Sequence, residues 1–100
     1  MQSQPRTWQS FLETSAPELS KEVAHVRESI MSDGALSLKL KTLMTMLCDA
    51  LLAHPDGVAN IAKRARALGA SEAEIGETVG VAFLMGGLPA LVTGANAFRD

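Results

Sequence analysis

The sequence contains no tyrosine and one cysteine, and aromatic residues make up only 4% of its 100 positions. The single cysteine, Cys48, has no second cysteine with which to form a disulfide, so a reducing compartment suits the protein. Residues 1–6 lack the charged region and the continuous apolar run of a secretory signal. We therefore expect a cytoplasmic protein.

Long apolar runs and an excess of one charge are also missing. Spanning a bilayer takes about 20 consecutive apolar residues, and every stretch of that length here contains a charge or a break at glycine and proline. Nine basic residues are nearly balanced by 11 acidic ones, for a net charge of -2, which gives no positively charged surface for nucleic acid. We expect neither a membrane nor a nucleic-acid partner.

Metal-ligating side chains are scarce as well. One of the two histidines, His25, lies between Glu22 and Glu28 on the polar side of a predicted helix, where a solvated face or an ion pair accounts for it. The sequence offers no further ligands that would complete a metal site there. We expect no metal and no cofactor.

Apolar side chains, by contrast, are abundant. Hydrophobic residues make up 47% of the chain and charged residues 20%, which is more apolar than a small free-standing domain needs. A lone domain of this size buries only roughly 60–70% of the surface that its unfolded chain exposes. Subunit contacts are the natural place for the excess, so we expect a homo-oligomer.

The hydrophobic pattern repeats with the period of an α-helix and never with that of a strand. The expected fold class is all-α with about six helices, in one domain overall. A helical segment over residues 1–35 would precede a core over residues 36–100. The predicted helices cover residues 7–13, 15–31, 37–53, 58–68, 71–85 and 89 onward.

Short motifs mark several helix ends. A serine followed three residues later by glutamate can form a capping box, which predicts helix starts at Ser15 and Ser71. Gly69 is expected to end the fourth helix. The segment His54-Pro55-Asp56-Gly57 is predicted as a turn, because proline disfavours a helical residue before it.

The predicted helix over residues 37–53 is apolar nearly all round. Only Thr42, Thr45 and Asp49 form a polar strip, so this helix should be central to the subunit or to an interface. Its apolar stripe consists of Leu40, Leu43, Met44, Leu47 and Leu51, flanked by Met46, Cys48 and Leu52.

Two internal glycines, Gly76 and Gly80, lie one turn apart in the helix predicted over residues 71–85. Each costs about 1 kcal/mol of helix propensity relative to alanine. We therefore expect another helix to approach closely at this face.

Four pieces of the sequence together carry a resemblance to a known family. They are Leu36-Ser37-Leu38-Lys39 leading into Thr42-Leu43-Met44, Ala62 to Ala70, Ser71 to Glu77, and Gly86 to Ala90. In their order and ungapped spacing they resemble the carboxymuconolactone decarboxylase family, which includes the alkylhydroperoxidase D-like (AhpD-like) proteins. The resemblance implies an all-α fold whose subunits assemble as trimers or hexamers.

The resemblance does not transfer the activity. In the peroxidase branch a glutamate precedes a Cys-x-x-Cys pair, and a histidine follows four residues later; without a gap, those places hold Thr42, His54, Gly57 and Ile61 here. A peroxidatic thiolate needs a nearby base, and its regeneration needs a second sulfur. The lactone decarboxylase branch matches better at the proline-containing turn, but its helix-borne histidine corresponds to Ile61 and its tyrosine to Met85.

His54 is the leading catalytic candidate, because imidazole titrates near neutral pH and Asp56 follows closely as a residue that could orient it. A surface position at a helix end explains the same residue without catalysis. Cys48 is expected to be buried among leucines and inert, so cysteine-dependent redox chemistry ranks last. The side chains expected to line a pocket for a small molecule are Thr42, Met44, Ile61 and Met85.

Three functions stay open at this point. The first is a family member that has lost the known catalytic groups and acts by binding a small apolar or acidic molecule, or by assembly alone. The second is an enzyme, lactone decarboxylase-like or hydroperoxidase-like, in which His54 is the general base and Asp56 orients it. The third is a structural homo-oligomer that supports a partner protein.

Overall fold

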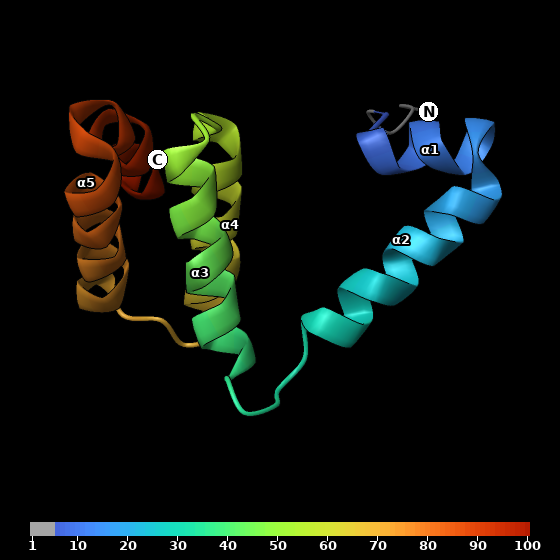
Figure 1. Ribbon diagram of the computed structural model, residues 1–100, viewed down its shortest axis with the longest axis horizontal. Coiled ribbons are helices and arrows are strands. Elements are labelled where there is room, and N and C mark those ends of the chain that lie inside the picture. Colours follow the sequence, from blue (N-terminus) through green and yellow to red (C-terminus); the bar gives the residue numbers. More distant parts are fainter. Residues whose placement is uncertain (1–5) are drawn as a thin grey trace. The chain divides into compact units, whose positions relative to one another are not determined.

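The computed structural model describes residues 6–100, and over this range it contains helices and no strand, which confirms the all-α prediction. The chain divides into two compact units, residues 1–32 and residues 33–100, in which the helices follow one another as drawn in Figure 1. The elements are α1 (Trp8–Ser15), α2 (Pro17–Ile30), α3 (Leu38–Leu51), α4 (Pro55–Ala67), α5 (Glu72–Gly94) and a 3₁₀-helix, η1 (Ala95–Phe98).

The first unit is a hairpin of α1 and α2. Thr7 caps α1, and its side chain and that of Ser10 form a reciprocal capping box. The capping box predicted at Ser15 is wrong: α1 continues through Ser15, and α2 begins with Pro17 behind Ala16, whose side chain makes no cap. Neither helix contains a buried residue, so this hairpin has no interior of its own.

The second unit is built around α3, which packs against both α4 and α5. The prediction that this helix is central is therefore confirmed. Thr42 is buried rather than part of an exposed polar strip, and its hydroxyl donates to the Leu38 carbonyl at 2.8 Å. The core of the unit consists of Leu43, Met46, Ala50, Val58, Ile61, Ala62, Ala65, Ala70, Ile75, Val79, Ala82, Ala90 and Ala97.

A kink at Gly87 divides α5, as the predicted bounds of the last helices require. The Gly87 backbone is non-helical, with φ 74° and ψ -162°, and separates the two helices that together make up α5. The helix predicted to start at Pro89 is the second of these, and η1 follows it. The bend turns this half and η1 back toward α4 (Figure 1). Arg66 of α4 holds η1 there by donating to the Ala97 carbonyl at 2.9 Å.

The close helix approach expected at Gly76 and Gly80 is not found in the described chain. A Cβ atom at Gly80 would have no atom within 4 Å, and one at Gly76 would meet only the Phe98 ring at 3.9 Å. Tight contacts occur later in α5: a Cβ atom at Gly86 would lie 2.6 Å from Leu51 Cδ2, and one at Gly94 would lie 3.1 Å from Val79 Cγ1. Periodicity placed the glycines on one face but could not say which face meets a neighbour.

The start of α5 confirms the capping box predicted at Ser71. Glu74 N–H donates to the Ser71 hydroxyl at 3.0 Å, and the Ser71 N–H donates back to the Glu74 carboxylate at 2.8 Å. Lys39 lies 2.9 Å from the other oxygen of that carboxylate. The Ser71 amide, and secondly the Lys39 ammonium, hold the pKa of Glu74 below its ordinary value, because both stabilise the charged form.

Gly69 ends α4, as predicted. The N–H of Ala70 donates to the Ala65 carbonyl at 2.9 Å, and that of Gly69 donates to the Arg66 carbonyl at 3.0 Å. Gly69 has φ 95°. This arrangement is a Schellman motif, in which a left-handed residue lets the chain leave the helix with its last carbonyls satisfied.

The end of α3 has the same shape without a glycine. The N–H of His54 donates to the Asp49 carbonyl at 2.9 Å, and Ala53 occupies the left-handed position with φ 61°. The turn predicted over residues 54–57 is wrong: α4 begins at Pro55, which sits at the first helical position. Proline is suited to that position, because its fixed φ is helical and its missing N–H would have no partner there.

The segment Glu72–Phe98 is long and apolar enough to cross a membrane by length and composition alone, with a mean hydropathy of 1.6. It is bent at Gly87, and Ile75, Val79 and Ala82 belong to the core of the second unit. The absence of a membrane partner stays a prediction.

Replacing Ala53 by glycine should stabilise the protein. A left-handed alanine costs roughly 1–2 kcal/mol, whereas the extra freedom of glycine in the unfolded chain costs about 0.4–1 kcal/mol. We expect Ala53→Gly to raise the free energy of unfolding by about 0.5–1 kcal/mol in urea denaturation. Ala67→Gly, at the exposed and right-handed end of α4, is the matched control and should lower it. A loss of stability in Ala53→Gly would contradict the left-handed backbone.

The capping box at Ser71 predicts a pH dependence. A carboxyl whose pKa is lowered by folding stabilises the native state above its unfolded pKa, and this contribution is lost as the pH falls through the folded value. Glu74→Gln keeps the hydrogen-bond acceptor but removes the charge, so unfolding midpoints between neutral and acid pH should fall less steeply than in the wild type. Ser71→Ala, which retains the backbone donor and loses only the smallest of the contributions that lower this pKa, should be less stable at every pH yet keep most of the wild-type slope. Equal slopes for wild type and Glu74→Gln would contradict the shift.

Candidate functional site

The junction between α3 and α4 brings an acid and an imidazole together. His54 Nδ1 lies 3.1 Å from Asp49 Oδ1, and the backbone bond from the His54 N–H to the Asp49 carbonyl joins the same two residues. The His54 side chain is 58% exposed and that of Asp49 is 24% exposed. The carboxylate is thus partly sheltered while the ring is open to a ligand.

The missing side chain of Gly57 leaves room for the Asp49 carboxylate. A Cβ atom at Gly57 would collide with the Asp49 carboxylate and lie 3.5 Å from the His54 Cβ. Gly57 lies in the first turn of α4, so the carboxylate rests against the start of that helix. A negative charge is stabilised there by the exposed amides and the helix dipole.

Asp56, the residue expected to orient His54, has a different partner. Its carboxylate lies 3.1 Å from Arg99 Nη1, and Arg99 also donates to the Asn96 side chain at 3.3 Å. The Asp56 side chain is exposed. Asp49, not Asp56, is therefore the carboxylate at the imidazole.

The four positions that match the peroxidase pattern separate into two pairs. His54 and Gly57 meet at the start of α4, as described. Thr42 and Ile61 are buried in the core of the second unit. Their side chains therefore belong to the packing of α3 and α4 and are not available to a ligand in the single chain.

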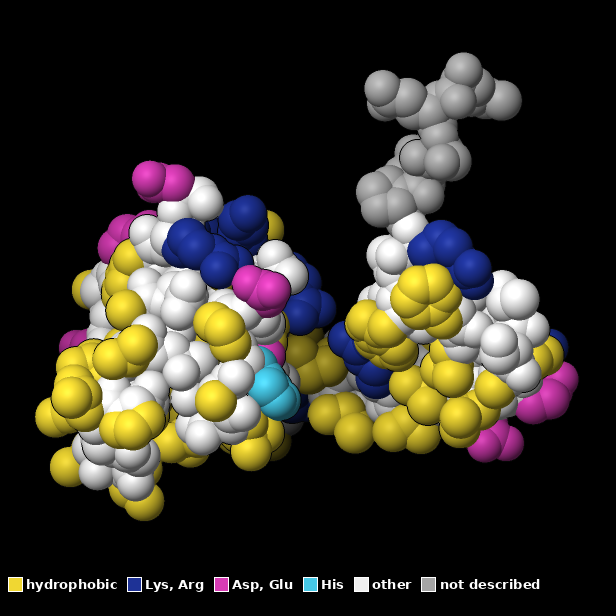
Figure 2. All heavy atoms as spheres, turned by 90° about the horizontal axis from the view of Figure 1, so that it is seen from above, with side chains coloured by type: hydrophobic (Ala, Val, Ile, Leu, Met, Phe, Trp, Pro, Cys, Tyr) yellow, Lys and Arg dark blue, Asp and Glu magenta, His cyan; other side chains and the backbone are white. Residues whose placement is uncertain are grey.

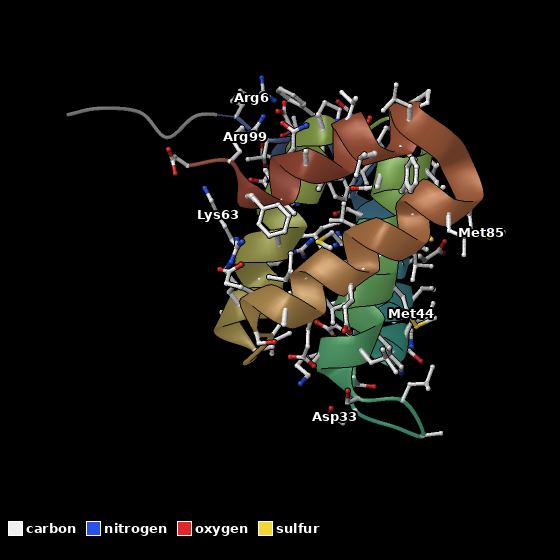
Figure 3. The ribbon with its side chains drawn as sticks, turned by 90° about the vertical axis from the view of Figure 1, so that its left-hand side faces the viewer. Arg6, Asp33, Met44, Lys63, Met85 and Arg99 are labelled. Atoms are coloured by element: carbon white, nitrogen blue, oxygen red, sulfur yellow. The ribbon has the colours of Figure 1, made fainter. Side chains whose placement is uncertain are left out.

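The two methionines expected to line a pocket lie on the surface. Met44, from α3, and Met85, from α5, point outward along the same edge of the second unit in Figure 3, whereas Lys63 and Arg99 lie at the opposite edge. Their exposed fractions are 48% and 72%. The predicted pocket residues thus do not enclose one cavity within a single chain.

An open groove does run between α3 and α5. It has a volume of about 260 Å³ and continues toward the start of α5, where Glu74 and Glu77 border it. The hydroxyl of Thr78 is bonded to the Glu74 carbonyl at 2.8 Å, so the walls offer few free polar groups. The lining residues are Leu40, Leu43, Met44, Leu47, Thr78 and Val81.

Hydrophobic side chains continue beyond the groove and gather on the molecular surface, where Figure 2 shows them as yellow patches. Leu84 and Leu88 of α5 are 78% and 64% exposed. Cys48 is also exposed, so the expectation that it is buried is wrong. It lies one helical turn beyond Met44, on the outer side of α3.

Within residues 6–100 no group of three or more histidine, cysteine, aspartate or glutamate side chains is placed to hold a metal ion. Sequence reasoning found His54 but missed Asp49, which it assigned to a polar strip. The available signal was the spacing of five residues between Asp49 and His54 across a helix end. When the residue before His54 has a left-handed backbone, these two residues come together.

Comparison with known proteins places this arrangement in context. Residues 17–100 match the sequence pattern of the Carboxymuconolactone decarboxylase family. A crystal structure of an apo carboxymuconolactone decarboxylase family protein from Legionella pneumophila superposes with a TM-score of 0.84 at 29% sequence identity, covering 90% of this chain and 80% of that one. No curated protein gives a significant match to the chain.

Proposed function

Because this chain belongs to the carboxymuconolactone decarboxylase family, we propose that it is a cytoplasmic homo-oligomer, a trimer or hexamer, that binds a small apolar molecule and lacks the peroxidase activity found in the family. The observation that carries the proposal is the exposed apolar surface of α3 and α5, with the groove between them.

The exposed surface of α3 and α5 supports assembly because it carries several large apolar side chains. Met44, Leu84, Met85, Leu88 and Val92 are each 48% or more exposed. Soluble monomers rarely leave contiguous apolar patches of this kind uncovered. A second copy of the chain is the proposed occupant, because most soluble oligomers are homo-oligomers and another subunit brings an equally apolar surface.

The groove supports an apolar ligand rather than an anionic one. Its walls are leucine, methionine and valine side chains, and the acidic Glu74 and Glu77 border one end. A negatively charged ligand would be repelled at that end. Methionine adapts its shape to irregular ligands, and a subunit laid over the open side would enclose the space that a single chain leaves open.

The cysteine content supports the proposed lack of peroxidase activity. The chain holds one cysteine, and the positions of the family's catalytic groups hold Thr42, His54, Gly57 and Ile61. Two of these are buried and neither of the others is a thiol. With one cysteine, the chain cannot run a thiol cycle that forms an intramolecular disulfide.

A second candidate function is general-base catalysis by His54. The contact between His54 and Asp49 favours it, because a carboxylate on one ring nitrogen leaves the other free to exchange protons. This candidate takes a ligand near the start of α4 and shares the oligomeric assembly with the first.

Assembly through the apolar surface predicts the effect of a charge at Met44. Burying an unpaired lysine costs several kcal/mol, so Met44→Lys should raise the dissociation constant at least tenfold, by about 1.4 kcal/mol or more. Light scattering of the wild type should give a multiple of 10.6 kDa, and native mass spectrometry should show an additional bound small molecule. Ellman's reagent should modify Cys48 faster in Met44→Lys than in the wild type.

Ala67→Lys, on the exposed end of α4, is the matched control and should keep the wild-type mass. A folded wild-type species of 10.6 kDa at micromolar concentration would overturn the assembly proposal. Wild-type subunits without any added mass, together with no thermal shift on addition of the neutral dye Nile red, would overturn the ligand proposal.

The proposed lack of peroxidase activity predicts that Cys48 contributes nothing to peroxide turnover. With tert-butyl hydroperoxide and dithiothreitol, peroxide consumption by the wild type should equal that of Cys48→Ser and stay at the level of the buffer, because Thr42 and Ile61 stand where the peroxidase pattern has the glutamate and histidine that activate its thiolate. Multiple turnovers that disappear in Cys48→Ser would contradict the proposal.

A further inference from the structure

We propose that Asp49 is a positioning residue for His54: it fixes the imidazole with its proton on Nδ1 and leaves Nε2 free to accept a proton from a ligand, and the pair exists only because residue 57 is glycine. The ligand class is a molecule with a hydroxyl group or with a C–H bond acidified by a neighbouring carbonyl. The inference rests on the second candidate function and deepens it.

Two contacts between the same two residues fix the ring. The backbone bond from His54 to the Asp49 carbonyl is 2.9 Å long, and the side-chain contact between Nδ1 and Oδ1 is 3.1 Å long. An ionised carboxylate only accepts hydrogen bonds, so the ring nitrogen facing it must carry the proton. The other nitrogen then holds the lone pair.

The exposure of the ring allows the free nitrogen to act. With 58% of the side chain exposed, a ligand can reach it without a change in the fold. In the proton-transfer step the ligand's O–H or C–H bond breaks, its electron pair stays on the ligand, and the proton forms a bond to Nε2. The resulting imidazolium is stabilised by the Asp49 carboxylate at Nδ1, as carboxylate–histidine pairs do elsewhere.

The glycine at residue 57 connects this pair to the family pattern. The Asp49 carboxylate occupies the space that any side chain at residue 57 would take. In the peroxidase pattern this residue is the second cysteine of the pair. A cysteine there would force the Asp49 carboxylate to shift from its position beside His54, so a glycine at residue 57 leaves room for the carboxylate as well as lacking a thiol.

The experiment is to read the tautomer of His54 in the intact protein by long-range ¹H–¹⁵N correlation spectra of histidine-labelled samples, at a pH where both histidines are neutral. In the wild type, Nδ1 of His54 should resonate as a protonated nitrogen and Nε2 as an unprotonated one. His25, which is exposed on α2, provides the reference for a solvated histidine in the same spectrum. Asp49→Ala, which removes the acceptor, should move His54 to the tautomer mixture of His25.

Two further variants separate positioning from general damage. Asp56→Ala removes a carboxylate that is closer to His54 in sequence but binds Arg99 instead, and should leave the His54 spectrum unchanged. Gly57→Ala keeps Asp49 but displaces its carboxylate, and should give the same tautomer change as Asp49→Ala, while circular dichroism shows an intact helical fold.

A wild-type His54 with unprotonated Nδ1, or an unchanged tautomer in Asp49→Ala, would overturn the positioning role. An unchanged tautomer in Gly57→Ala would overturn the requirement for glycine. Light scattering on the same variants should still report the wild-type assembly, and the Met44→Lys variant should keep the wild-type tautomer. Failure of this inference is thus distinguishable from failure of the assembly proposal.

Discussion

The packing of α3 between α4 and α5 sets the constraint on which the rest of the second unit depends. A helix that is apolar on nearly every side cannot be covered by two neighbours, so Met46 and Ala50 lie in the core while Met44 and Leu40 remain at the surface. The same placement leaves the groove beside α5 open. It also carries Asp49 to the end of α3, where the chain turns directly into α4.

The helices and most of their ends could be predicted from the sequence because the signals are local. The capping box at Ser71 and the stop at Gly69 involve residues at most a few positions apart, and their geometry is fixed by the helix itself. The capping box predicted at Ser15 does not form, because α1 runs through this residue. The pattern around Pro55 indicates a turn, although proline is equally suited to the first position of a helix.

The site could be predicted only in part, because its geometry depends on which face of each helix meets a neighbour. The chemistry of imidazole makes His54 a candidate from the sequence alone. Its contact with Asp49, however, depends on the left-handed backbone at Ala53, which no side-chain pattern predicts. Cys48 was misplaced for a related reason: in a helix that is apolar all round, periodicity does not tell the inner side from the outer side. The open surroundings of Gly80 have the same origin.

The left-handed backbone at Ala53 also limits how this region can change by mutation. Glycine, asparagine and aspartate are the residues that tolerate such a backbone, whereas valine, isoleucine and threonine are effectively barred from it. Few single replacements of Ala53 are therefore tolerated, and most would destabilise the turn between α3 and α4. The neighbourhood of His54 is consequently more free to vary through the side chains around it than through the chain segment that carries it.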